Sequence, residues 1–166
     1  MDTSMSGPQS AGTVSFNRFG SCGSRIAMQP DTSLPLQLTA TLPTTPLRAI
    51  AEPSFTQIDM SVRNLSATAV QVMTMRRGAR LALTKEGVVV AGAGGMRPAG
   101  TQYAIEPGEA HDYKSILNLV NCDTNSGLAP GDYQVHALQR FRFVDEGLNI
   151  GSEILVYGGP WDVEVG

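Results

Sequence analysis

The stretch GLAPGDYQVHALQRFRFV (residues 127–144) indicates the fold of this chain more clearly than any other part of the sequence. It begins with a Pro-Gly turn and continues from Tyr133 as a long run without Gly or Pro. Because successive side chains of a strand point to opposite faces, this run divides into an apolar and aromatic set and a set with a histidine and two arginines. We therefore expect a turn followed by a strand at about 132–144, with the aromatic set in a core.

The second face of this predicted strand carries the residues that could bind a partner, His136, Arg140 and Arg142. We expect this face to be solvated, and one interpretation is a docking patch for an acidic protein. We favour the alternative, in which the arginines pair with Asp162 and Glu164 of the last strand, because opposite charges face each other across paired strands.

The rest of the chain consists of short apolar or alternating runs separated by turn residues. We expect further strands at residues 13–16, 34–42, 55–66, 70–75, 79–84, 88–92, 101–105, 110–120, 152–157 and 161–165. Residues 110–121 could instead form a helix, but the Pro-Gly turn before them favours a strand. Gly158-Gly159-Pro160 predicts a bulge or a switch between sheets. Roughly eight to ten strands without a helical period favour an antiparallel sandwich over a barrel.

The composition is that of one folded domain. The 166 residues are enough for a core, and 42% hydrophobic against 16% charged residues excludes a disordered chain. We expect a flexible arm at 1–12 and a single domain at 13–166. A net charge of −3 gives no attraction to nucleic acid. No apolar run is long enough for a membrane-spanning helix, and the first residues as given do not form a signal peptide.

The chain has two cysteines, Cys22 and Cys122, both in polar, turn-rich surroundings. We predict that they form a disulfide, which would restrict the unfolded chain by about 4 to 5 kcal/mol because the closed loop is long. Two unrelated buried thiols are the alternative. A disulfide would indicate an oxidising compartment, and we expect a secreted or cell-surface protein, with a virion surface as the alternative.

No motif in the sequence points to catalysis, a metal or a cofactor, and we expect a protein that is not an enzyme. His111 and Asp112 are adjacent, so on a strand they face opposite ways. The glycine-rich residues 92–95 are not followed by a predicted helix, and residues 123–125 lack the other ligands of a calcium loop. Residues 64–66 match a glycosylation sequon, which matters only in a eukaryotic secretory pathway.

Four residues of the opening stretch resemble a known corner. Leu128, Pro130, Gly131 and Tyr133 match the Leu-x-Pro-Gly-x-Tyr corner of many Greek-key sandwiches. In that corner the tyrosine hydroxyl bonds to the backbone a few residues upstream and fixes the turn between the sheets.

The chain from about Phe16 onward resembles a group of exported actinobacterial immunoglobulin-like domains. The ordered features that carry the resemblance are FGSCG, SVRNLS, TKEGVVVA, EPGE, the second cysteine, LAPGDYQV and GGPWDVEV. The resemblance implies an immunoglobulin-like antiparallel β-sandwich with Greek-key connections, and it supplies no catalytic residues. A looser similarity is to the intracellular proteinase inhibitor type, another immunoglobulin-like sandwich with a Pro-Gly-x-Tyr turn.

These observations lead to two expectations for function. The first is a non-enzymatic module of the cell envelope or of an extracellular assembly, with an adhesion, filament or virion-surface role through loops, edges and the N-terminal arm. Its partner would be a protein, including copies of itself. The alternative is a protease inhibitor that presents residues 92–100 to an active site, although the cysteine pair departs from an intracellular setting.

Overall fold

The computed structural model describes residues 16–48, 55–76, 78–93, 98–145 and 150–166. The regular structure within these ranges is one 3-10 turn, η3 (Phe16–Arg18), and the strands β1 (Leu36–Thr41), β2 (Phe55–Asn64), β3 (Val70–Arg76), β4 (Arg80–Lys85), β5 (Val88–Ala91), β6 (Pro98–Ile105), β7 (Ala110–Asn118), β8 (Gly131–Val144) and β9 (Ile150–Val165). The predicted all-β class is therefore confirmed. The predicted arm at 1–12 lies outside the described residues.

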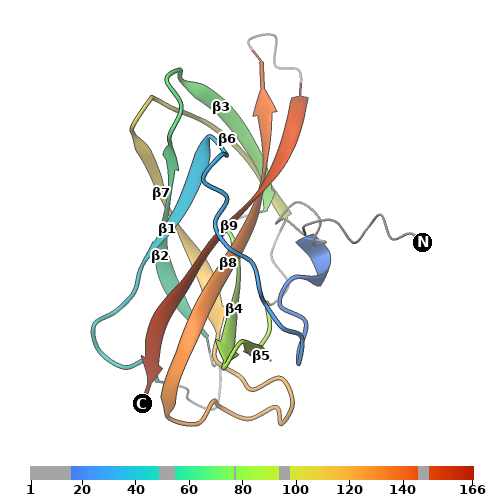
Figure 1. Ribbon diagram of the computed structural model, residues 1–166, viewed down its shortest axis with the longest axis vertical. Helices are drawn as coiled ribbons and strands as arrows, with labels where there is room; N and C mark the ends of the chain where they lie inside the picture. Colours follow the sequence, from blue (N-terminus) through green and yellow to red (C-terminus); the bar gives the residue numbers. More distant parts are fainter. Residues whose placement is uncertain (1–15, 49–54, 77, 94–97, 146–149) are drawn as a thin grey trace, which may run out of the picture.

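The strands form two antiparallel sheets (Figure 1). One has the order β1-β2-β7, and the other has the order β5-β4-β8-β3-β6 with β9 also paired to β8. Strand β8 organises the larger sheet, because β9 pairs with it over most of its length while β4 and then β3 pair with its other edge. The strand predicted from the opening stretch is thus the centre of the larger sheet.

One apolar core lies between the two sheets. It combines side chains from the smaller sheet, including Leu38, Ile58 and Leu117, with side chains from the larger sheet, including Leu83 and Phe141. Alternate side chains of β2 point into this core, and Ile58, Met60 and Val62 are buried there. Burial of this apolar surface is the main favourable term in folding.

Two backbone contacts close one side of the core. The Leu47 amide donates to the Glu164 carbonyl and the Gly166 amide donates to the Leu47 carbonyl, both at 2.8 Å. Leu47 is buried and forms a parallel bridge with Val165, so the segment after β1 pairs with the end of β9. On another side, the Ala79 amide before β4 donates to the Ser115 hydroxyl of β7 at 2.8 Å.

Three details differ from the sequence-based expectations or refine them. The predicted strands at 152–157 and 161–165 form one strand, β9, with a bulge where Trp161 pairs with Val135 and Gly158 with Ala137. The bulge is one of the two alternatives that the Gly-Gly-Pro sequence predicted. Phe16 lies in η3, not in a strand, and residues 13–15 lie outside the described part. Residues 110–118 form a strand, as expected.

Candidate functional site

The two cysteines form the predicted disulfide. Cys22 and Cys122 are joined, with 5.9 Å between their Cα atoms. The bond connects a segment near η3 to the turn after β7, and the Cys122 amide donates to the Val90 carbonyl of β5 at 2.8 Å. Both ends of the disulfide therefore lie beside β5, at the edge of the larger sheet.

The corner at the start of β8 has the contact that its motif predicted. The Tyr133 hydroxyl donates to the Ala129 carbonyl at 2.6 Å, four residues upstream. Leu128 is buried in the main core, and Tyr133 is 5% exposed. The Lys85 ammonium lies 4.7 Å from the centre of the Tyr133 ring, a cation–π contact that covers the outer side of the corner.

His136 is buried, so the predicted solvated face is wrong at this residue. Its side chain is 3% exposed. Nε2 lies 2.8 Å from the Thr84 hydroxyl and Nδ1 lies 2.7 Å from the Tyr157 hydroxyl. Burial disfavours the charged imidazolium and lowers the pKa of His136 to about 4. A histidine with both nitrogens engaged and almost no exposed surface is placed to organise the interior rather than to meet a partner.

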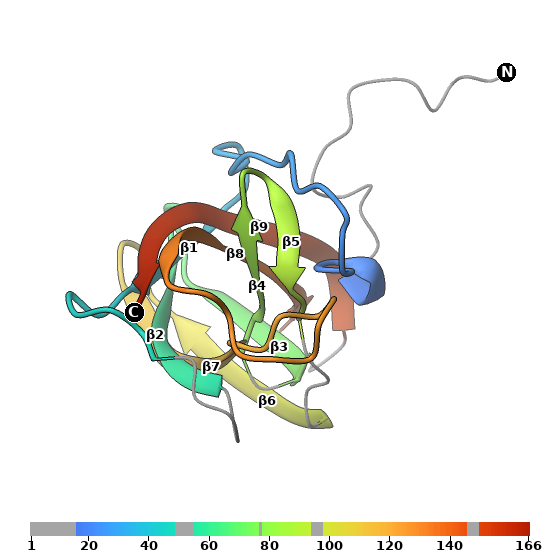
Figure 2. The same cartoon turned by 90° about the horizontal axis from the view of Figure 1, so that it is seen from below.

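The face of β8 that carries His136 and Leu138 is covered in part by the N-terminal side of the chain. Phe16 and Phe19 pack with Ala82, Leu138 and Tyr157 in a second apolar cluster on the outer face of the larger sheet. We call residues 16–28 the cap. In Figure 2 the cap lies outside β5 and β4, against the larger sheet.

Backbone pairing and a close approach hold the cap on β5. The Gly23 amide donates to the Val89 carbonyl at 3.0 Å, and the Val89 amide donates to the Ser24 carbonyl at 2.8 Å. Gly20 has a φ of +78°, and a Cβ atom there would lie 2.9 Å from the Ala93 amide nitrogen. The FGSCG motif therefore combines a buried aromatic ring, a glycine that permits close contact, and the disulfide. Sequence reasoning missed the cap, although the two phenylalanines three residues apart were a signal for it.

Arg140 and Arg142 pair with an acidic residue, but not with those expected. The Glu153 carboxylate lies 2.7 Å from Arg140 Nε and 3.7 Å from Arg142 Nε. Asp162 and Glu164 instead lie opposite Gln134 and Asp132. The Arg140 guanidinium also lies 4.9 Å from the centre of the Phe16 ring. The arginines therefore contact β9 and the cap, which corrects the predicted pairing, and the docking patch stays a prediction.

His111 lies where β6 and β7 come together. Its ring stacks on Tyr103 with 3.8 Å between ring centres, and Tyr113 follows at 6.2 Å. The Tyr113 hydroxyl donates to the Gln139 amide oxygen of β8, and burial raises the pKa of Tyr113 well above its ordinary value. The row of rings thus connects β6 and β8 of the larger sheet with β7 of the smaller sheet, and it contributes to the packing of the two sheets.

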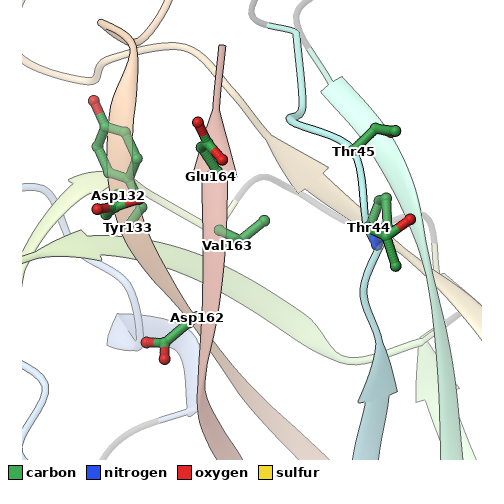
Figure 3. A pocket seen from close by; sticks show the side chains of 8 residues that line it. Thr44, Thr45, Asp132, Tyr133, Asp162, Val163 and Glu164 are labelled. Carbon is green, nitrogen blue, oxygen red and sulfur yellow. The ribbon is translucent and has the colours of Figure 1, made fainter.

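A shallow groove lies beside the Tyr133 corner (Figure 3). It has a volume of about 500 Å³ and is lined by Pro43, Thr44, Thr45, Asp132, Tyr133, Asp162, Val163 and Glu164. Its three carboxylates are on exposed positions of β8 and β9. Among the described residues, no group of three or more His, Cys, Asp or Glu is placed to hold a metal ion. The groove offers carboxylate acceptors and hydroxyl groups.

The sequon asparagine is part of the interior. Asn64 has no exposed surface, and its side-chain amide donates to the carbonyls of Thr68 and Ile105 at 2.9 Å each. Its oxygen accepts bonds from the amide and the hydroxyl of Ser66. Asn64 in the folded chain fixes the turn after β2. The loop at 92–100, which the inhibitor hypothesis requires, includes residues 94–97 outside the described part, so that hypothesis stays a prediction.

The outer face of the smaller sheet contrasts with the covered face of the larger one. Phe55 on β2 is 51% exposed and Ile116 on β7 is 57% exposed. On the same face, Lys114 Nζ lies 2.5 Å from the Asp59 carboxylate, and both side chains are more than half exposed. We call the outward side chains of β2 and β7 the β2–β7 face.

Comparison with known proteins adds only distant structural similarity. No protein-family model matches the sequence, and the search of curated proteins gave no match. Among solved structures, a Listeria innocua β-glucosidase in complex with glucose has 14% identity and a TM-score of 0.37, covering 79% of this chain and 16% of the enzyme. A β-glucosidase from Erythrobacter marinus has 16% identity and a TM-score of 0.34, covering 78% of this chain and 15% of that chain.

This chain therefore spans less than a fifth of the β-glucosidases it matches. Similarity at this level does not extend the activity of those enzymes to it. None of the helices in the described ranges is long and apolar enough to cross a membrane.

Proposed function

We propose that this chain is an exported immunoglobulin-like β-sandwich that works without catalysis, as a module of the cell envelope or of an extracellular assembly. The strand order supports the fold assignment. In an immunoglobulin-like domain, strands A, B and E form one sheet, and strands G, F, C and C′ form the other. Here β1-β2-β7 fits the first sheet, and β9-β8-β3-β6 fits the second. The tyrosine corner then lies at the start of strand F, its usual position.

The hairpin of β4 and β5 is an addition to this scheme. It lies between β3 and β6 in the chain but pairs with β8, so it extends the larger sheet beside the position of strand F. The chain crosses between the sheets from β2 to β3, back from β6 to β7, and again from β7 to β8, which supports Greek-key connections. The hairpin also provides the edge on which the cap lies.

The disulfide supports export. Cys22 is exposed, and the Cys22–Cys122 bond closes a separation of 100 residues, so its persistence requires an oxidising environment. The same feature belongs to the resemblance with exported actinobacterial domains. A cell surface or a virion surface fits this requirement.

The difference between the two outer faces is the observation that carries the proposal. The cap covers the centre of the outer side of the larger sheet, and the polar side chain of His136 there is buried. On the smaller sheet, the β2–β7 face holds two large apolar side chains that are more than half exposed. Because apolar side chains gain free energy when they leave water, such neighbours mark a surface suited to contact with another protein.

Sedimentation velocity of the purified, oxidised chain tests the proposal. If the protein is an assembly module, the weight-average sedimentation coefficient should rise between about 1 µM and about 1 mM, the range in which contacts of modest area form. A chain that stays monomeric over this range would contradict the assembly function. Turnover in a panel of glycoside, ester and peptide substrates, abolished by an alanine substitution of His111 or His136, would contradict the non-enzymatic assignment.

A further inference from the structure

We infer that the β2–β7 face binds the same face of a second copy of this chain, around a two-fold axis that runs between β2 and β7 and parallel to them. This inference rests on the proposed function, and it names the surface and the symmetry of the contact. It begins from the apolar pair on the face. Phe55 lies opposite Asn118 and Ile116 opposite Gln57, so Phe55 and Ile116 are diagonal neighbours on adjacent strands.

The four apolar side chains gather around the axis under this symmetry. Rotation about an axis between the two strands places β2 of one copy over β7 of the other, at the same height along the strands. Phe55 of each copy then lies opposite Asn118 of the other, beside the second Phe55 at the same height and two positions along the strand from Ile116. Side chains that are 51% and 57% exposed in one copy would be removed from water in the pair. Packed sheets lie about 10 Å apart, a distance that these side chains can span.

The charges on the face match under the same rotation. Asp59 of β2 and Lys114 of β7 are direct cross-strand partners, so they lie at one height. The rotation places Asp59 of each copy over Lys114 of the other, and the two acids and two bases alternate around the axis. A two-fold axis that crosses the strands at this height would instead place Asp59 over Asp59 and Lys114 over Lys114. The charge pattern therefore selects one orientation of the two sheets.

The area of the contact predicts weak association. Strand β2 has 10 residues, and the rotation overlaps β2 and β7 alone, so these two strands present a flat area of roughly 300 Å² per copy. Two copies would bury roughly 600 Å², which is in the range of weak contacts and below that of stable specific interfaces. A contact of this size suits a repeating assembly, in which many weak contacts act together. The balanced charge of the central Asp59–Lys114 pair argues against a strongly charged partner in the same place.

Two charge-reversing variants test the orientation. In Asp59→Lys each copy carries two bases near the axis, and in Lys114→Asp each copy carries two acids. Each variant alone should associate at least about tenfold more weakly than the wild type, because like charges meet across the contact. An equimolar mixture of the two should regain association, because a mixed pair brings the two bases onto the two acids. Sedimentation velocity with one variant labelled by a fluorophore measures the mixed pair directly.

Matched variants control for the change of charge and for folding. Asp123→Lys and Arg18→Asp make the same changes at exposed sites outside the face, and they should associate as the wild type does. All variants should unfold at nearly the wild-type temperature, because the exposed Asp59–Lys114 pair contributes little to stability. Ile116→Lys should weaken association, whereas Leu65→Lys, at another exposed apolar residue, should not.

The outcomes separate this inference from the proposed function. If the wild type stays monomeric, both fail. If the wild type associates but Asp59→Lys and Ile116→Lys associate equally well, the assembly function stands and this face is not its contact. If both charge variants are weakened and their mixture does not recover, the parallel two-fold arrangement is wrong.

Discussion

Nδ1 of His136 lies 2.7 Å from the hydroxyl of Tyr157, a member of the second apolar cluster. With Thr84 on the other nitrogen, both ring nitrogens of His136 have a hydroxyl partner. A neutral imidazole has one donor and one acceptor, and a hydroxyl can serve either of them. The hydrogen bonds of the neutral ring are therefore satisfied in the folded chain. Burial disfavours the charged ring, because it would lose its hydration.

This arrangement predicts that the chain loses stability in acid. The pKa of His136 is about 4 in the folded chain, against 6.5 for an unperturbed histidine. Between these values the unfolded chain binds more protons, so the contribution of His136 is complete above pH 6.5 and declines as the pH falls toward 4. The difference corresponds to about 3 kcal/mol. Urea unfolding of the wild type and of His136→Gln at several pH values measures it.

The comparison of the two proteins isolates the histidine from the carboxylates, which also titrate in this range. The stability of His136→Gln should be lower near neutral pH and should fall less steeply below pH 6.5. His111→Gln provides a histidine substitution outside the second cluster. Equal slopes for the wild type and His136→Gln would show that His136 is not the group responsible.

The Cys22–Cys122 disulfide is expected to stabilise the whole chain and to hold the cap. Replacing both cysteines by serine should lower the free energy of unfolding by about 4 to 5 kcal/mol, because the unfolded chain regains the freedom of a long loop. Urea unfolding of Cys22→Ser/Cys122→Ser beside the oxidised wild type measures this loss. Hydrogen exchange should show the largest increase at the amides of Gly23 and Val89, which pair the cap with β5. Unchanged protection at these amides would show that packing alone holds the cap.

How much of this structure could be predicted from the sequence is shown best by β8. Strand parity correctly separates Tyr133 and Phe141 from His136 and Arg140, and the Pro-Gly-x-Tyr motif correctly indicates the corner. Parity does not say what covers each face, however. The cover over the face that holds His136 and Leu138 comes from a segment more than a hundred positions earlier in the chain. Leu138, an apolar residue on the supposedly solvated face, is the local sign that something covers it.

Which acidic residue pairs with Arg140 and Arg142 depends on the bulge in β9, several residues away along the strand. The sequence favours Asp162 and Glu164 opposite Arg140 and Arg142, because opposite charges face each other across paired strands. The bulge instead lets β9 continue along β8, so Arg142 faces Glu153. Register over a strand of this length depends on the bulge, and alternation alone does not reveal it.

Charge reversal at two positions of β9 should change the free energy of unfolding in opposite directions. Glu153→Lys replaces the carboxylate shared by two arginines with a third base and should destabilise the chain by about 1 kcal/mol. Glu164→Lys should stabilise it by a few tenths of a kcal/mol, because Glu164 faces Asp132, a like charge. Thermal unfolding of both variants in low salt measures the difference. Equal shifts of the same sign would contradict the register of β8 and β9.

Loss of the buried Asn64 side chain should cost more stability than loss of its partner Ser66. The Asn64 amide donates to the carbonyls of Thr68 and Ile105, and its oxygen accepts two bonds from Ser66. Asn64→Ala would leave the buried Ile105 carbonyl without this donor and should cost roughly 2 to 3 kcal/mol. Asn64→Asp keeps the acceptor but removes the donor, and it also buries a charge, so it should cost at least as much.

Ser66→Ala removes one partner on the more exposed side of the turn and should cost about 1 kcal/mol. Urea unfolding of the three variants should therefore place Ser66→Ala nearest to the wild type, with Asn64→Ala and Asn64→Asp well below it. The contrast between the two residues arises because a buried carbonyl that loses its donor has no water to replace it, whereas water can reach the Ser66 side. An Asn64→Ala variant as stable as the wild type would show that the turn after β2 does not depend on this side chain.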